Sequence, residues 1–279
     1  MLCIIDASKG GVGKSTIARA LIHFLKFYGL VTVIFSSPEG VVMLYLIGGS
    51  KGGTGKSTVA RAIIHFLQFF GLVLVIDTDP ANPDVYKVVT ANGKPKSGII
   101  AAVASWATRD EFSLFTDLLE RKQYGEPANI VINTGGGALA ALVEYSDYWD
   151  SECLALIGHR LKTIWPLDTS FDALEALARY VAAYPYRVID VVKNGKDGQD
   201  IFFEFWNEDA QPLREMIVKS GGHDDLYMTR MGTRAANALR GNGLMLSEAD
   251  HIKDRKCQKD VQFWLRENED LFKTIIGES

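Results

Sequence analysis

The stretch SKGGTGKSTVARAIIHF (residues 50–66) joins a glycine-rich loop directly to a run with helical periodicity. The apolar run MLYLI (residues 43–47) comes just before it and is typical of a buried strand. Apolar residues then recur at helical spacing, which predicts an amphipathic helix from about Lys56 to Phe70. LVLVI (residues 72–76) follows and predicts a fully buried parallel strand. The order strand, loop, helix, strand predicts an α/β fold.

The loop carries the residue types that hold phosphate. A loop that leaves a parallel strand and enters a helix presents backbone N–H groups and the positive end of the helix dipole to an anion. Glycines let the backbone approach closely, the lysine of GKST reaches the β- and γ-phosphates, and the serine coordinates Mg²⁺. The predicted nucleotide-binding residues of the loop are Gly52, Gly53, Thr54, Gly55, Lys56, Ser57 and Thr58. Ser50 stands where the strict pattern has glycine, but the flanking strand and helix and the complete GKST favour this interpretation over a surface turn.

The chain contains a near copy of this unit. Residues 1–42 align without gaps on residues 43–84, and 25 of the 42 positions are identical. The copies differ where the second strand ends, because VIDTDP (residues 75–80) carries two aspartates and VIFSSP (residues 33–38) carries none. Without nearby carboxylates a phosphate site does not easily hold Mg²⁺ or orient a water. We therefore predict that the second copy is the working site.

The first copy is predicted to be a degenerate duplicate spanning residues 1–42. Its Lys14 and Ser15 retain the residue types that bind phosphate weakly. The unit could pack at a sheet edge, exchange between chains, or reflect how the sequence was joined. The sequence leaves these alternatives open.

The loop SKGGTGKST resembles the deviant Walker A motif of ParA/MinD-type ATPases, in which an extra lysine opens the loop. That lysine is Lys51 here. The resemblance implies a P-loop NTPase fold, with a doubly wound, mostly parallel sheet flanked by helices, over residues 43–279. It also implies an ATP-dependent homodimer, in which Lys51 reaches the partner's nucleotide in the manner of an arginine finger.

Further positions follow from the same resemblance. VIDTDP resembles the segment in which Asp79 positions the attacking water and Asp77 supports the Mg²⁺ shell, although a polar turn is the alternative. ANIVINTGGG (residues 128–137) places Asn133 where the family usually has aspartate, which puts the hydrolysis rate and metal affinity in doubt more than nucleotide binding. The implied groups are catalytic Lys51, Lys56 and Asp79, metal-binding Ser57, Asp77 and Asn133, and the cofactors ATP and Mg²⁺.

Two later segments allow either a functional or a plain structural role. TGGG (residues 134–137) is either a switch loop near the γ-phosphate or a glycine-rich turn. In YRVIDVVKNGKDG (residues 186–198), Asn194 stands where family members place an asparagine that reads the adenine edge, but an isolated Asn-Gly is also a common turn.

The resemblance runs from Met43 to about Gly198. Within the superfamily, the chain most resembles the TraL-type conjugal-transfer ATPases and related plasmid-maintenance proteins, through the segments DTDPANPDVYK (residues 77–87), INTGGGALAALVEY (132–145), GHRLKTIWPLDT (158–169) and VIDVVKNGKDG (188–198). The expected function is an ATP-dependent dimerising switch with slow hydrolysis, acting with a protein partner in plasmid transfer or partition. The alternative is a nucleotide-binding scaffold with little or no hydrolysis. A P-loop kinase leaves Lys51 unexplained, and an Fe–S reductase lacks the required cysteine pair.

The C-terminal part, from about residue 200, is predicted to be helical. Its run DVQFWLRENEDLFKTII (residues 260–276) is amphipathic, and its acidic residues favour packing in the core or on a partner over a membrane surface. The segment HIKDRKCQKD (residues 251–260) is locally basic, and solvated charge is a commoner explanation than nucleic-acid contact.

Composition sets outer bounds. The 279 residues carry a net charge of −4, which does not favour non-specific DNA binding. No apolar run approaches the roughly 20 residues of a transmembrane helix, and the N-terminus lacks the pattern of a signal peptide. Three separated cysteines favour neither a disulfide framework nor structural zinc, and a reducing, cytoplasmic setting is expected.

Overall fold

The computed structural model describes residues 41–49, 51–120, 129–146, 149–198 and 202–277. The predicted duplicate in residues 1–42, with Lys14 and Ser15, therefore lies outside the described residues except for its last two positions. Strand β1 begins at Val42, one residue before the predicted start of the ATPase-like unit.

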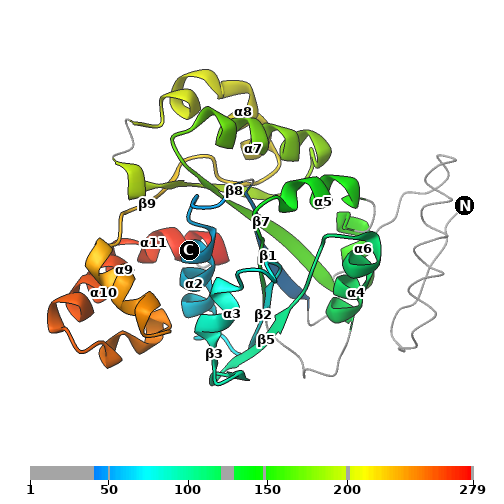
Figure 1. The fold of residues 1–279 in the computed structure, drawn as a ribbon. Coiled ribbons are helices and arrows are strands. Elements are labelled where there is room, and N and C mark those ends of the chain that lie inside the picture. The colour runs from blue at the N-terminus through cyan, green and yellow to red at the C-terminus, as the bar shows by residue number, and fades with distance from the viewer. Residues whose placement is uncertain (1–40, 50, 121–128, 147–148, 199–201, 278–279) are drawn as a thin grey trace, which may run out of the picture.

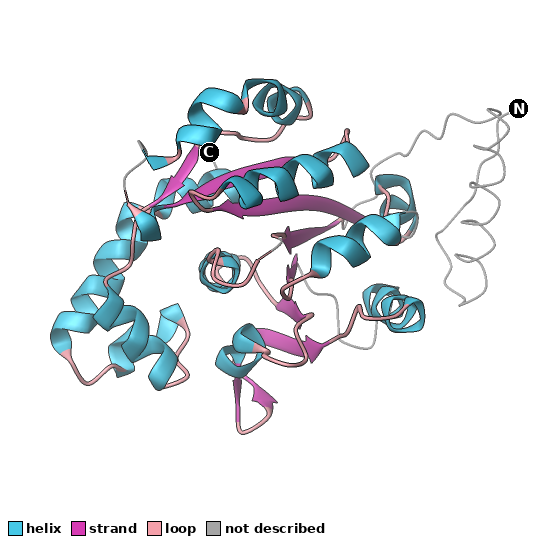
Figure 2. Cartoon of the chain, turned by 45° about the horizontal axis from the view of Figure 1, so that its top comes forward, coloured by secondary structure: helices cyan, strands magenta, loops and turns pink. Residues whose placement is uncertain are grey.

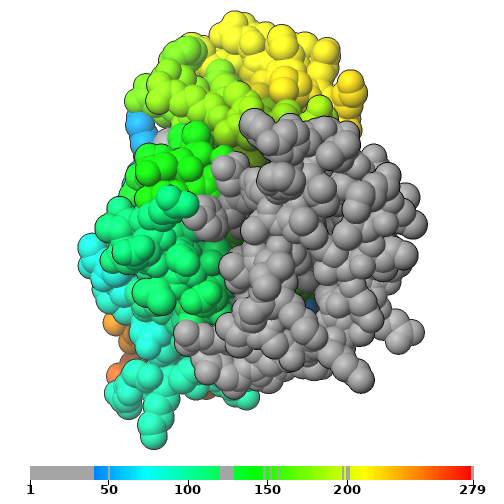
Figure 3. Space-filling view, turned by 90° about the vertical axis from the view of Figure 1, so that its right-hand side faces the viewer, coloured from blue at the N-terminus to red at the C-terminus, as the bar shows by residue number. Residues whose placement is uncertain are grey.

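A seven-stranded sheet forms the centre of the molecule, with strand order β5-β2-β6-β1-β7-β8-β9 (Figure 1). Every pairing in it is parallel. The strands are β1 (Val42–Ile47), β2 (Val73–Asp77), β5 (Ile99–Val103), β6 (Asn129–Asn133), β7 (His159–Leu167), β8 (Ile189–Asn194) and β9 (Leu226–Met228). Strands β3 (Thr90–Ala91) and β4 (Lys94–Pro95) form a separate antiparallel hairpin, which projects at the lower end of the molecule in Figure 3.

Helices cover both faces of the sheet, as the turned view shows (Figure 2). One face carries α2 (Lys56–Leu67), α3 (Asp84–Val89), α9 (Thr233–Gly241), α10 (Arg255–Glu267) and α11 (Glu269–Ile276). The other carries α4 (Arg109–Glu120), α5 (Ala138–Glu144), α6 (Ser151–Leu156), α7 (Phe171–Ala183) and α8 (Gln211–Lys219).

Strand β1 shows why both faces are covered. Tyr45 and Ile47 enter one core and Leu44 and Leu46 the other, because successive side chains of a strand point to opposite faces. An entirely apolar strand is therefore buried on both sides, which is the pattern of a doubly wound fold. The predicted fold class is confirmed.

Helix α2 ends earlier than the periodicity predicts. It stops at Leu67, and the N–H groups of Phe69 and Phe70 bond to carbonyls three residues back, at Phe66 and Leu67. The side chains of Phe69 and Phe70 are exposed, so no packing extends the helix to its predicted end at Phe70.

The C-terminal part contains helices α8 to α11 and also supplies strand β9 at the edge of the sheet. The amphipathic run of residues 260–276 divides at Asn268 into α10 and α11. The buried side chains Val261, Trp264, Phe272 and Ile275 join the core that covers β1, and Leu265 packs against it. The prediction of core packing is thus confirmed. None of the described helices has the length and hydrophobicity that crossing a bilayer requires.

Candidate functional site

The glycine-rich loop connects the carboxyl end of β1, the central strand, to the first turn of α2. Gly53 (φ 85°) and Gly55 (φ 98°) have left-handed backbone conformations that residues with a Cβ rarely adopt. Gly55 is the N-cap of α2, and its carbonyl accepts the N–H groups of Thr58 and Val59, each at 3.0 Å. The loop therefore delivers the chain into the start of a 12-residue helix, where the dipole favours an anion.

The predicted loop residues lie together at this helix start. Thr54 is buried, and Ser57 and Thr58 are half-buried in the first turn of α2. Gly52 and Gly53 are exposed, and nothing lies within 4 Å of a Cβ built on either. The backbone is therefore open to a ligand on this side of the loop.

Lys56 folds back over the loop. Its side chain is buried, and its Nζ donates to the Lys51 carbonyl at 2.5 Å. Burial lowers the pKa of Lys56, and the Asp79 carboxylate acts in the opposite direction. An ammonium group has three donors, so one backbone acceptor leaves capacity for phosphate oxygens.

Lys51, the other lysine of the loop, has a different partner. Its Nζ forms an ion pair with Asp172, in the first turn of α7, and both side chains are exposed. The two lysines of the loop thus have different surroundings, one enclosed and one at the rim.

The carboxyl ends of β2 and β6 bring together the two residues predicted beside the metal. Asp77 and Asn133 are register partners, and Asn133 Nδ2 donates to Asp77 Oδ1 at 3.1 Å. Asp77 is completely buried, and its Oδ2 accepts the N–H groups of Val85 and Tyr86 at 2.9 and 3.1 Å. Burial raises the pKa of Asp77, and the hydrogen bonds that its carboxylate accepts oppose that shift. Asp77 therefore ties β2 to the start of α3.

Asn133 leaves one acceptor unused. Its Oδ1 is buried and has no hydrogen-bond partner among the described residues. Because the amide nitrogen donates to Asp77, the oxygen is free to accept from a ligand-bound water. This orphaned acceptor fits the outer shell of a metal ion held at the phosphate loop. No group of three or more His, Cys, Asp or Glu side chains suited to a metal occurs in the described part of the chain.

The loops after β2 and β6 meet beside the phosphate loop. A Cβ on Gly135 would lie 3.1 Å from Asp79 Cβ and 3.2 Å from the Thr78 carbonyl oxygen. A Cβ on Gly136 would lie 4.0 Å from the Gly52 nitrogen. The segment of residues 134–137 thus lies close to both the half-buried Asp79 and the phosphate loop, and its role as a switch loop stays a prediction.

The end of β8 contacts the other side of the phosphate loop. Asn194 Nδ2 donates to the Thr54 carbonyl at 2.8 Å, and Lys196 Nζ donates to the Gly53 carbonyl. The adenine-reading role of Asn194 stays a prediction. Lys196 was not predicted as a site residue, and the one signal in the sequence is that a lysine stands two residues after a strand of the parallel sheet.

The site and sheet define the class of the chain. A loop with an additional lysine, leaving the central strand of a parallel sheet, makes it a P-loop NTPase fold of the ParA/MinD type, with a deviant Walker A loop. The chain belongs to the family of protein MobD from Acidithiobacillus ferrooxidans: the two are 32% identical over 245 residues, which cover 84% of this chain and 85% of that protein.

Solved structures resemble the chain more distantly. The septum site-determining protein MinD from Pyrococcus horikoshii, complexed with Mg-ADP, is 12% identical with a TM-score of 0.48, covering 82% of this chain and 96% of that one. An ATP complex of an McdA variant from Cyanothece is 13% identical with a TM-score of 0.46, covering 86% and 98%. No family model matches the chain.

Proposed function

We propose that this protein is a nucleotide-dependent switch, which binds Mg·ATP on the loop of residues 51–58, dimerises around it and hydrolyses it slowly. The observation that carries the proposal is the loop itself, with Lys56 enclosed over a glycine backbone at the start of a helix. The backbone N–H groups and the Lys56 ammonium would donate to the triphosphate, and Asp79 and the segment of residues 134–137, which lie beside the loop, would sense the γ-phosphate.

Magnesium completes the proposed site. The Ser57 hydroxyl would coordinate Mg²⁺, and Asn133 would accept from a metal-bound water through its unpartnered Oδ1. Asp77 would act mainly by holding Asn133, because its oxygens already accept hydrogen bonds from Asn133 and from the start of α3. Bound Mg²⁺ supplies the positive charge that offsets the phosphates.

Lys51 supports the dimeric part of the proposal. Its ammonium lies at the rim of the loop and not over it, where it can meet a second subunit. The family resemblance assigns this lysine to the partner's nucleotide, so ATP would join two copies of the chain.

Membership of the MobD family supports a role in the transfer of mobile plasmids, with a protein partner still to be found. Partition or positioning of a plasmid is the other role that the ParA/MinD-type fold supports. In both, nucleotide binding and release would control contact with the partner.

Calorimetry with Mg·ATP tests the binding step. The wild type is expected to bind, Lys56→Ala is expected to lose binding, and Lys94→Ala, in the exposed β3–β4 hairpin, is the control. Absence of binding by the folded wild type would overturn the proposal. Size measurement with ATP and with ADP tests dimerisation, both on the full chain and on a chain that begins at Val41.

A second candidate is a nucleotide-binding scaffold with little hydrolysis. Asn133 favours it, because an amide replaces the carboxylate that the family usually has and brings no negative charge to the metal. Phosphate release separates the two candidates: a scaffold shows no turnover above the Lys56→Ala baseline.

A further inference from the structure

Two side chains from one turn hold two consecutive carbonyls of the phosphate loop. Strand β8 ends at Asn194, and the short helix η3 (Gly195–Asp197) follows. Asn194 Nδ2 donates to the Thr54 carbonyl at 2.8 Å, and Lys196 Nζ donates to the Gly53 carbonyl. These contacts cross 140 and 143 residues of sequence, so the fold creates them.

The direction of these carbonyls sets the direction of the loop amides. In a planar trans peptide, the C=O of one residue and the N–H of the next point in opposite directions. Because the carbonyls of Gly53 and Thr54 point toward the turn after β8, the N–H groups of Thr54 and Gly55 point away from it. Backbone N–H groups in such a loop are the donors that grip phosphate.

Asn194 is buried in close contact with the phosphate loop. Asn194 is 4% exposed, and its Oδ1 accepts the Lys196 N–H at 3.2 Å, which fixes the orientation of the amide. A Cβ on Gly55 would lie 2.1 Å from Asn194 Nδ2. Gly55 is thus required both by its backbone conformation and by the close approach of Asn194.

Strand β9 supports the turn from its other side. A Cβ on Gly195 would lie 2.5 Å from the Tyr227 hydroxyl and 2.7 Å from the Met228 carbonyl oxygen. The Tyr227 hydroxyl donates to the Gly198 carbonyl at 2.8 Å. The turn is therefore held between β9 and the phosphate loop, and the C-terminal part of the chain contributes to the geometry of the site.

We propose that Asn194 and Lys196 are positioning residues that hold the amides of the phosphate loop toward the triphosphate, with β9 as their support. The inference rests on the proposed function and deepens it. It assigns the Asn194 amide to the loop, a role in phosphate binding that is separate from the predicted contact with the base.

A ligand without a base separates these two roles. Binding of a non-hydrolysable ATP analogue and of tripolyphosphate, each with Mg²⁺, is measured by calorimetry. Asn194→Ala and Lys196→Met are each expected to weaken both ligands by a similar factor, about tenfold for the loss of one hydrogen bond. Tyr227→Phe removes the hydroxyl that donates to the Gly198 carbonyl and is expected to weaken both ligands about two- to fivefold, within the effect of one hydrogen bond.

Two variants far from the turn after β8 serve as controls. Asn129→Ala at the opposite end of β6 and Lys219→Met at the end of α8 are expected to bind as the wild type does. Loss of the ATP analogue with unchanged tripolyphosphate binding in Asn194→Ala would overturn the inference and leave the proposed function standing. A folded wild type that binds neither ligand would overturn the proposed function first. If Asn194→Ala does not fold, the binding of both ligands by Lys196→Met and by Tyr227→Phe tests the inference.

Discussion

Lys51 of the phosphate loop and Asp172 of α7 form an ion pair within one chain. The Lys51 side chain is 44% exposed and that of Asp172 is 64% exposed, so water competes for both charges. A pair of this kind contributes about 0–1 kcal/mol. A pair this weak could be given up if Lys51 contacts a phosphate group on a second subunit, as proposed.

Asp172→Asn is expected to favour dimerisation in ATP. In the wild type, each subunit would have to break its Lys51–Asp172 ion pair to form the dimer, whereas the variant has no such pair to break. The dissociation constant of the dimer should therefore fall about three- to tenfold. The measurement is sedimentation or light scattering over a concentration series. Glu175→Gln is the matched control, because Glu175 is an exposed acid on the same helix, paired with Arg179. Weaker dimerisation of Asp172→Asn would instead make Asp172 part of the interface.

Asn133→Asp is expected to destabilise the protein when Mg²⁺ is absent. The new carboxylate would replace a donor 3.1 Å from Asp77 Oδ1, and two buried carboxylates at this distance cannot both ionise easily. A loss on the order of 3 kcal/mol is expected, as for an uncompensated buried charge. Thermal unfolding with EDTA and with Mg²⁺ measures it, and Mg²⁺ should restore more stability to this variant than to the wild type.

Asn129→Asp, which makes the same change at the other end of β6, is the control. Equal Mg²⁺ stabilisation of the Asn133→Asp and Asn129→Asp variants would show that no metal site lies beside Asp77.

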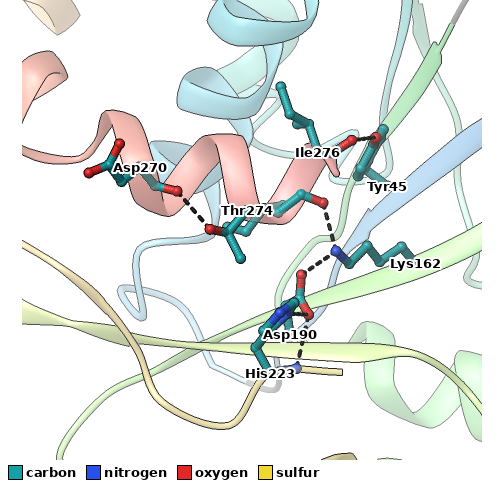
Figure 4. A network of polar contacts seen from close by, with 8 residues as sticks. Tyr45, Lys162, Asp190, His223, Asp270, Thr274 and Ile276 are labelled. Carbon is teal, nitrogen blue, oxygen red and sulfur yellow. Dashed lines mark hydrogen bonds and ion pairs between the residues drawn. The ribbon is translucent and has the colours of Figure 1, made fainter. Parts of the chain in front are cut away.

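Lys162→Met is expected to loosen the C-terminal helix. Lys162 Nζ pairs with the buried Asp190 at 2.7 Å and donates to the Ile275 carbonyl of α11 at 2.7 Å (Figure 4). Asp190 Oδ1 also forms a hydrogen bond with His223 Nδ1, over 2.8 Å. Removing the lysine leaves a buried charge short of a partner, which costs about 3–5 kcal/mol.

Denaturant unfolding and hydrogen exchange in α11 measure this effect. Lys162→Met combined with Asp190→Asn should recover part of the loss, because the buried charge is then also removed. Lys273→Met breaks an exposed pair with Glu269 on α11 and should cost less than about 0.5 kcal/mol. A similar loss of stability for Lys162→Met and Lys273→Met would show that the contacts of Lys162 with Asp190 and α11 do not hold the C-terminal helix in place.

His65 is expected to make stability depend on pH. Burial lowers the pKa of His65, which lies edge-on to the rings of Phe66 and Phe69. The unfolded chain therefore binds the proton more readily, and stability should fall as pH drops below the unfolded value of about 6.5, until the folded pKa is passed. His65→Gln removes the contribution of this protonation to stability. The temperature at which the variant unfolds should therefore fall less than that of the wild type between neutral and acid pH. Equal slopes in the same buffers would refute the prediction.

Strand β1, the phosphate loop and helix α2 could be predicted from the sequence because their structure depends on interactions between nearby residues. Strand and helix periodicities, and the need for glycine at Gly53 and Gly55, act within a few residues, so β1, the loop and α2 could be predicted together. The end of α2 could not, because it depends on whether Phe69 and Phe70 find a surface to pack on. Strand β9 was missed for a similar reason, since three residues carry little periodicity and pair only with β8.

The partners of the site residues arise from the arrangement of the strands. The residue types of the loop predicted a phosphate site, but the pairing of Lys51 with Asp172, of Asp77 with Asn133 and of Asn194 with Thr54 depends on which strands become neighbours. Such contacts join residues 56 to 140 positions apart, and only packing of a sheet with two covered faces brings them within hydrogen-bond distance. A short motif specifies its own backbone, whereas the direction in which each side chain is held follows from the elements that surround it.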